Sequence, residues 1–266
     1  MVYTERKIGF VFGNGSLPIL LLKECPNAIC ALLGSTPSNI GTNKHQHFKI
    51  SEISEILSFF KKQGVTHICL AGGVTKPKID IHLLKFKLIP LLWKLLTLSN
   101  RGDNFILTTI LSYIKAKGFQ IISATDIIPN LLAKTGCFTR VKPNKEALQS
   151  IAIARNFLDD ISKYDISQAC IVENRCITAI EGIEGTANMV TRMMPFNKGE
   201  AILVKAAKQG QTLKVDMPTI GIHTIQQCIE AKVIGIALQA ECMMFLDKTE
   251  ALKLANSVGM FIIGIE

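Results

Sequence analysis

The stretch Ile8-Gly9-Phe10-Val11-Phe12-Gly13-Asn14-Gly15-Ser16-Leu17-Pro18 decides the fold of this chain. Its first five residues are largely apolar, as in a buried strand, and a helix pattern begins at Pro18. A turn between a strand and a helix can present backbone N–H groups to a phosphate. The turn has two glycines where the dinucleotide fingerprint has three, so a purely structural tight turn explains it as well. Gly13, Gly15 and Ser16 are candidate substrate contacts.

The rest of the N-terminal half repeats this alternation of strand and helix patterns. Strands are expected at residues 8–12, 28–33, 67–72 and 120–123, and helices at residues 18–23, 50–63 and 104–117. Strands that alternate with helices indicate a parallel sheet with helical crossovers. We therefore predict an α/β, Rossmann-like N-terminal domain over residues 1–143.

The second half has a different pattern, with the division expected within residues 141–152. A helix signal at residues 145–162 precedes short strand signals at 169–172, 176–180 and 201–204, and alternation returns over residues 222–265. The two halves share no internal repeat. Residues 144–266 are therefore predicted to form a second, distinct α/β domain.

A second glycine loop follows the strand expected at residues 67–72. It contains Gly72 and Gly73, followed by Val74, Thr75 and Lys76. Loops at the carboxyl ends of parallel strands face one crevice, where open α/β sheets bind ligands. Gly72, Gly73 and Thr75 are therefore further candidate substrate contacts, although a tight turn alone also accounts for the glycines.

A basic loop at residues 204–221 separates a strand pattern from a helix pattern. It contains lysines, carboxamides, a hydroxyl and a carboxylate: Lys205, Lys208, Lys214, Gln209, Gln211, Thr212 and Asp216. Lysines can neutralise phosphates, and a carboxylate among lysines has its pKa lowered and stays ionised for a metal ion or a water. A solvated basic loop is the alternative interpretation.

An acidic, glycine-rich loop follows the strand expected at residues 176–180. Its polar members are Glu181, Glu184, Thr186 and Asn188, and Asp165 with Gln168 precedes the neighbouring strand. Carboxylate oxygens suit Mg²⁺ or a similar hard cation. We take Glu181 as a candidate metal ligand and Gln168, Thr186 and Asn188 as candidate substrate contacts; an exposed acidic turn is the alternative.

Composition narrows the classes of protein. The chain has 266 residues, of which 48% are hydrophobic and 19% charged, so it can form a sizeable core. Its eight cysteines form no CxxC pair, which favours a reducing cytoplasm, and no leader segment is evident. The pair His45 and His47 lacks a nearby third ligand and is expected in an exposed loop.

The net charge of +9 calls for an anionic partner. Nucleic acid is not predicted, because aromatic residues are sparse and no recognisable binding module occurs. An anionic metabolite or an anionic membrane surface fits better. Residues 79–98 combine leucines with lysines around Pro90; they cannot span a bilayer, but they could rest on lipid, bind acyl chains, or form an ordinary core helix.

In chain order, these motifs resemble the LpxI-type UDP-2,3-diacylglucosamine pyrophosphatases of lipid A biosynthesis, from Lys7 to Gly264. The resemblance rests on Gly13, Gly15, Leu17 and Pro18; residues 71–77; Gly102 and Asp103; Gly118 and Phe119 with residues 129–132; Asp165 and Gln168; residues 181–186; and Lys205, Lys208, Gln211, Asp216 and residues 218–221.

The resemblance implies a fold, a reaction and a location. It implies two domains with the substrate cleft between them, and Mg²⁺-assisted hydrolysis to UMP and 2,3-diacylglucosamine 1-phosphate (lipid X), with water attacking the β-phosphorus. The expected enzyme is cytoplasmic, with peripheral contact at the inner membrane; whether it forms a homo-oligomer is left open. The candidate catalytic residues are Asp216, Lys208, Lys205, Gln211 and Glu184; Asp216 and Glu181 are candidate metal ligands, and Thr212 and Lys214 are candidate substrate contacts.

The chain also departs from the family pattern. Ala187 and Thr212 stand where the family has aspartates, and Lys214 stands where it has arginine, which lysine replaces poorly at a bidentate site. A catalytically weakened or inactive lipid-nucleotide binding protein is therefore the alternative. A Rossmann-type oxidoreductase is a third interpretation, and the missing third loop glycine counts against it.

Overall fold

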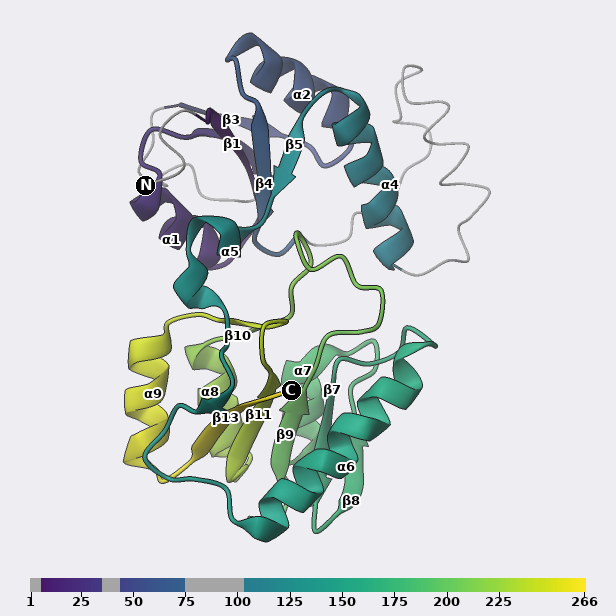
Figure 1. Cartoon of the computed structure of the whole chain (residues 1–266), viewed down its shortest axis with the longest axis vertical. Coiled ribbons are helices and arrows are strands. Elements are labelled where there is room, and N and C mark those ends of the chain that lie inside the picture. The colour runs from purple at the N-terminus through teal and green to yellow at the C-terminus, as the bar shows by residue number, and fades with distance from the viewer. Residues whose placement is uncertain (1–5, 35–43, 75–102) are drawn as a thin grey trace. The chain divides into compact units, whose positions relative to one another are not determined.

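The computed structural model describes residues 6–34, 44–74 and 103–266 (Figure 1). The predicted contacts at Thr75 and in residues 79–98 lie outside these ranges. The chain divides into two compact units, Met1–Pro129 and Asn130–Glu266. All eight cysteines are free thiols. No helix within the described ranges is long and apolar enough to cross a membrane.

The first unit contains a five-stranded, fully parallel sheet in the order β3-β2-β1-β4-β5. Its strands are β1 (Ile8–Phe12), β2 (Ile29–Leu33), β3 (His45–Phe48), β4 (His67–Ala71) and β5 (Gln120–Ile122). Its helices are α1 (Leu17–Glu24), α2 (Ile53–Lys62), α4 (Asp103–Ala116) and α5 (Ala124–Ile127), before the turn η3 (Pro129–Leu131). This strand order is that of a Rossmann fold, which confirms the predicted fold class.

This sheet lies between two layers of helices. Figure 1 shows α1 and α5 on one side of the sheet and α2 and α4 on the other. A Cβ at Gly9 would lie 3.0 Å from Cε1 of Phe60 in α2, so the glycine lets this ring approach the sheet. Phe10 points to the opposite face and is fully buried. Gly9 therefore allows α2 to pack closely against β1, whereas the Phe10 ring fills the space on the opposite face of the sheet.

The two glycine loops close on each other at the carboxyl ends of β1 and β4. The N–H of Asn14 donates to Gly73 O (2.7 Å), and the N–H of Gly73 donates back to Asn14 O (2.8 Å). The N–H of Gly13 donates to Ala71 O at 2.9 Å. The loops share one edge of the sheet, as predicted, and these three amides are occupied by backbone carbonyls. The close contact between the loops thus explains why Gly13 and Gly72 are glycines, since a Cβ at either position would collide with the other loop.

We predict that Gly13→Ala destabilises the first unit while Gly73→Ala does not. A Cβ at Gly13 would lie 2.3 Å from Gly73 O, whereas the nearest atom to a Cβ at Gly73 is 4.0 Å away. Overpacking of this kind costs about 1–3 kcal/mol. Hydrogen exchange of the β1 and β4 amides should be faster in Gly13→Ala and unchanged in Gly73→Ala. Equal protection in the two variants would contradict this explanation.

The prediction of a loop at His45 and His47 is wrong. Both residues lie in β3, an edge strand that pairs in parallel with β2, and the two ring centroids are 6.1 Å apart. A polar strand at a sheet edge lacks the apolar run that marks buried strands, so its pairing is set by β2 rather than by its own pattern.

The second unit contains a six-stranded mixed sheet in the order β6-β13-β11-β9-β7-β8. Strands β9, β11 and β13 are parallel to one another, whereas β6, β7 and β8 pair antiparallel. The strands are β6 (Gly136–Cys137), β7 (Ala169–Glu173), β8 (Cys176–Ile180), β9 (Ile202–Lys205), β11 (Gly235–Gln239) and β13 (Phe261–Ile265). A separate pair joins β10 (Thr219–Ile220) to β12 (Met244–Phe245).

Helices cover both faces of this sheet (Figure 1). They are α6 (Lys145–Ser162) on one face, and α7 (Gly185–Met193), α8 (Ile222–Glu230) and α9 (Lys248–Ser257) on the other. Successive β9 residues serve opposite layers: Val204 packs with α6, and Leu203 with the other three helices. Because side chains alternate along a strand, Lys205 shares the face of Leu203, toward α7 and α8.

The observed division precedes the predicted one at residues 143 and 144. Strand β6 pairs with β13, and the N–H of Ala133 donates to Met243 O at 2.9 Å. These contacts join the segment after Pro129 to the second unit. A two-residue strand has too few side chains to be recognised in a sequence, so the longer helix signal that follows it sets the predicted start of the domain.

Candidate functional site

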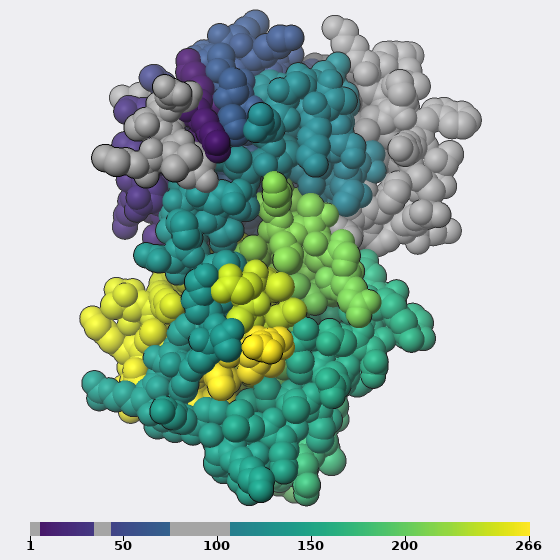
Figure 2. Space-filling view, viewed as in Figure 1, coloured from purple at the N-terminus to yellow at the C-terminus, as the bar shows by residue number. Residues whose placement is uncertain are grey.

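The candidate site lies at one edge of the second sheet, where β9 and β8 end and β7 begins. This arrangement follows from the antiparallel register, in which Lys205 pairs with Ala169 and Ile180 pairs with Cys170. It brings the basic loop, the acidic loop and the segment before β7 to the same edge. Figure 2 shows the loop after β9, in bright green, at the molecular surface.

A buried lysine connects the basic and acidic loops. The ammonium of Lys205 donates to Thr186 Oγ1 (2.7 Å), and the Thr186 hydroxyl donates to Glu181 Oε1 (2.7 Å). The second carboxylate oxygen of Glu181 accepts the backbone N–H of Gln168 at 3.1 Å. Lys205 retains only 9% of its surface, and Thr186 is the second residue of α7. A lysine, a hydroxyl and a carboxylate are thus held in a fixed row.

The protonation of Lys205 is set by two opposing effects. Burial disfavours the ammonium and lowers its pKa from the usual 10.5, and the negative charge of Glu181 acts in the opposite direction. The buried thiol of Cys228 in α8 lies close enough to interact with the same ammonium. Neither contact was predicted: the pairing of β7, β8 and β9 brings Glu181 toward Lys205, and helix α8 supplies Cys228.

Lys208 forms an ion pair with a carboxylate from the segment before β7. Its ammonium lies 2.6 Å from Asp165 Oδ1. Asp165 adopts a left-handed conformation with φ +57°, which aspartate tolerates better than most residues. The backbone N–H of Lys208 also donates to Gln211 Oε1 at 3.0 Å. The ion pair fixes the direction of the lysine side chain at the surface.

Gln211 links Lys208 to the carboxylate of the basic loop. Its side-chain amide donates to Asp216 Oδ2 at 2.9 Å and to the carbonyl oxygen of Asp216 at 2.7 Å. Asp216 itself is exposed. Three of the predicted catalytic residues, Lys208, Gln211 and Asp216, are therefore joined by direct hydrogen bonds. An exposed carboxylate held in this way can position a water or meet a cation.

Glu184 is paired with a residue that the sequence analysis did not single out. Its Oε1 lies 3.1 Å from Nε of Arg192 on α7, and Arg192 also donates to Ile180 O at 2.8 Å. A hydrogen bond from its own backbone and the neighbouring Arg192 lower the pKa of Glu184. Asn188 donates to Glu184 O at 2.9 Å. These contacts give Glu184 and Asn188 a structural role at the start of α7.

Few side chains at the site could act as ligands for a cation. Within the described ranges, no three His, Cys, Asp or Glu side chains gather closely enough to hold a metal ion. Glu181 accepts two hydrogen bonds and already faces the Lys205 ammonium. Asp216 fits a cation better, since Mg²⁺ often uses one or two carboxylates and completes its shell with substrate phosphates and water.

The remaining predicted contacts lie in two places. Thr212 and Lys214 are in the basic loop, before β10. Gly13, Gly15, Ser16, Gly72 and Gly73 lie in the first unit, at the carboxyl ends of β1 and β4, where open α/β sheets bind ligands. Gln239, at the end of β11, accepts the N–H of Ala207 at 3.0 Å and was not predicted. Its position at the end of a strand is the feature of the sequence that could have indicated a role at the site.

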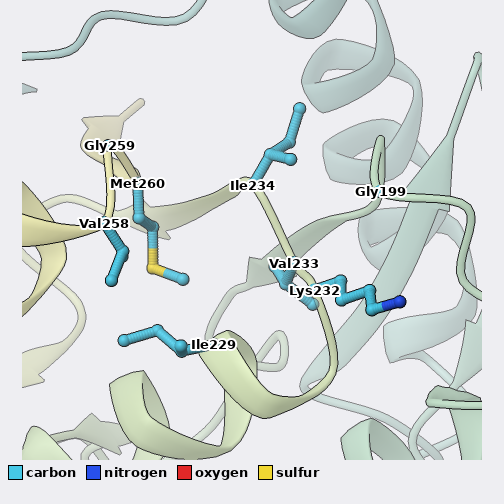
Figure 3. Close-up of a pocket in the computed structure, with 8 residues that line it drawn as sticks. All are labelled: Gly199, Ile229, Lys232, Val233, Ile234, Val258, Gly259 and Met260. Carbon is cyan, nitrogen blue, oxygen red and sulfur yellow. The ribbon is translucent and has the colours of Figure 1, made fainter.

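A cavity of about 270 Å³ lies elsewhere in the second unit, at the amino ends of β11 and β13. Figure 3 shows Ile229, Val258 and Met260 gathered on one side, with the Lys232 ammonium directed away from them. The cavity therefore lies at the edge of the sheet opposite Lys205. It contains none of the predicted site residues.

The fold and the site define a two-domain α/β protein with a basic, hydrogen-bonded cluster at one sheet edge. Residues 7–131 match the LpxI N-terminal domain and residues 134–263 match the LpxI C-terminal domain. The chain is 26% identical, over 98% of both lengths, to "UDP-2,3-diacylglucosamine pyrophosphatase LpxI" of Caulobacter vibrioides (strain ATCC 19089 / CIP 103742 / CB 15). The chain belongs to the LpxI family.

Proposed function

We propose that this chain hydrolyses the pyrophosphate bond of UDP-2,3-diacylglucosamine, giving UMP and 2,3-diacylglucosamine 1-phosphate (lipid X), in lipid A biosynthesis. The observation that carries the proposal is that two hydrogen-bonded groups meet at one sheet edge of an LpxI family member: Lys205 with Thr186, and Lys208 with Gln211, which holds Asp216. A cytoplasmic location is part of the same proposal.

The cluster has the chemistry that such a displacement requires. Charge on the transferring phosphoryl group must be neutralised by groups that are already in place. Lys205 and Lys208 supply two ammoniums, one buried and one at the surface. Asp216, held by Gln211, orients the attacking water or meets a cation. The hydroxyl oxygen of Thr186 holds the ammonium of Lys205 in place by accepting a hydrogen bond from it.

The proposal includes Mg²⁺, with Asp216 as its protein ligand. Glu181 is a weaker candidate than the sequence indicated, because both of its oxygens already accept hydrogen bonds. A bound divalent cation supplies charge neutralisation at the phosphates. Removing it with EDTA and restoring Mg²⁺ tests this part of the proposal alone.

We expect purified protein to release UMP from UDP-2,3-diacylglucosamine in the presence of Mg²⁺. In ¹⁸O-labelled water, attack at the β-phosphorus places the label in the sugar phosphate, and the bridging oxygen leaves with UMP. Mass spectrometry of both products reads the position of the label. A mock preparation from cells that do not produce the chain, purified in the same way, is the control for contaminating activity.

Two outcomes would change the conclusion. Label found only in UMP would mean attack at the α-phosphorus and contradict the proposed chemistry. Substrate binding without turnover would favour the lipid-nucleotide binding protein, an interpretation motivated by Ala187 and Thr212 in place of family aspartates.

A further inference from the structure

Two neighbouring loops beside the cluster expose large apolar side chains. Tyr164 is 65% exposed and Ile166 is 54% exposed in the segment before β7, and Ile183 after β8 is fully exposed. The N–H of Gln168 donates to Glu181 Oε2 at 3.1 Å and joins the two loops. Exposed apolar side chains on adjoining loops can form a contact site for a partner or a membrane. We define these three residues as the apolar tips.

The loop geometry directs the tips outward. Asp165 lies between Tyr164 and Ile166 in sequence and turns toward Lys208, to which it is ion-paired at 2.6 Å. Its two neighbours are left at the surface. The N–H of Glu181 donates to Ala169 O at 2.9 Å, which fixes the base of the second loop. All three tips therefore stand on loops anchored to the sheet.

The acidic side chains of the two loops are neutralised by basic neighbours, so they do not oppose contact with an anionic surface. Each acidic side chain of the two loops has a basic neighbour: Asp165 faces Lys208, Glu181 faces Lys205, and Glu184 faces Arg192. Lys163 adds a further cation, 5.2 Å from the Tyr164 ring centre. Tyrosine and lysine are favoured where a protein meets lipid headgroups, since each combines apolar surface with a polar end.

We propose that Tyr164, Ile166 and Ile183 insert into the headgroup region of an anionic bilayer and dock the second unit there. The inference rests on the proposed function for its purpose, because a diacylated substrate resides in a membrane. Docking at these loops sets the Lys205 and Lys208 cluster beside the headgroups, where the pyrophosphate lies. Insertion itself needs no substrate and is tested without one.

The first test is vesicle flotation of the full chain with phosphatidylcholine vesicles, with or without about 30% phosphatidylglycerol. Substituting Ser at all three tips removes the apolar surface, and about 1.4 kcal/mol of lost burial corresponds to a tenfold change in affinity. We expect the triple variant to bind the anionic vesicles at least tenfold more weakly. Phe196→Ser, after the end of α7, and Val258→Ser, after the end of α9, change exposed apolar residues outside the two loops and are controls that should bind like wild type.

A second measurement separates insertion from adsorption by charge. Ile183→Trp in a Trp93→Phe background places the protein's one tryptophan at a tip. Its emission should shift to shorter wavelength on anionic vesicles and be quenched by brominated lipid chains. Binding without quenching would overturn the proposal.

A third measurement distinguishes docking of the tips on a membrane from binding of the tips to the acyl chains of the substrate. With detergent-dispersed substrate, the triple variant should release UMP at the wild-type rate, because no bilayer is involved. An equal loss in detergent and on vesicles would assign the tips to the acyl chains of the substrate and overturn membrane docking. Absence of UMP release by wild type would contradict the proposed function while leaving the vesicle result to decide this inference.

Discussion

Asp216→Ala is expected to lower the rate of UMP release by about 10²–10³-fold while leaving the fold intact. Asp216 is the carboxylate of the basic loop, and the amide of Gln211 holds it in place. Without it, the attacking water or the cation loses its positioning group. Because Asp216 is exposed, the free energy of unfolding should change by no more than about 0.5 kcal/mol. Steady-state kinetics and thermal unfolding measure the two effects separately.

Two further variants make the Asp216 test specific. Asp216→Asn keeps a side-chain oxygen for Gln211 but removes the charge, so its activity should stay low if the charge is what matters. Asp160→Ala removes an exposed carboxylate from α6 and should retain activity. Wild-type turnover in Asp216→Ala would show that the carboxylate takes no part in the reaction.

The fold was predictable where a buried strand or helix leaves a clear pattern of apolar residues in the sequence. Strand β1 and helix α6 follow the expected ranges, because apolar residues mark the buried strand and Asn144 caps the helix by accepting the N–H of Ala147 at 2.8 Å. Strand β3 was missed, since its polar residues pair at a sheet edge. The domain boundary was placed late because β6 is recognisable only through its pairing with β13.

The candidate site was predictable in its members but not in its pairings. The spacing of Lys205, Lys208 and Asp216 in one loop was visible in the sequence. The partners of the two lysines come from earlier segments, Thr186 19 residues before Lys205 and Asp165 43 residues before Lys208, brought close by the antiparallel strands β7 and β8. Arg192 was missed for a related reason: one turn or more along α7, it folds back onto Glu184. Such contacts depend on register, which composition does not specify.

Lys205→Met is expected to lower kcat/KM by about 10²-fold or more, with kcat reduced and KM raised together. The ammonium faces charge that is present in the bound pyrophosphate and grows in the transition state, so both constants should respond. Methionine keeps much of the buried volume. Lys253→Met, on the exposed surface of α9, is the matched control and should leave both constants unchanged. A change in KM alone would limit Lys205 to substrate binding.

The pH dependence of the same variant gives a second, independent check. Burial lowers the pKa of Lys205 below 10.5, so wild-type activity should fall on the alkaline side as pH rises through that lowered pKa. Between the lowered pKa and 10.5, the unfolded chain binds more protons at this residue than the folded chain. Lys205 therefore makes the free energy of unfolding rise with pH in this window, and Lys205→Met should lose that rise. Activity and stability should thus move in opposite directions in wild type; a parallel fall of both would show that alkaline inactivation is unfolding rather than loss of the ammonium.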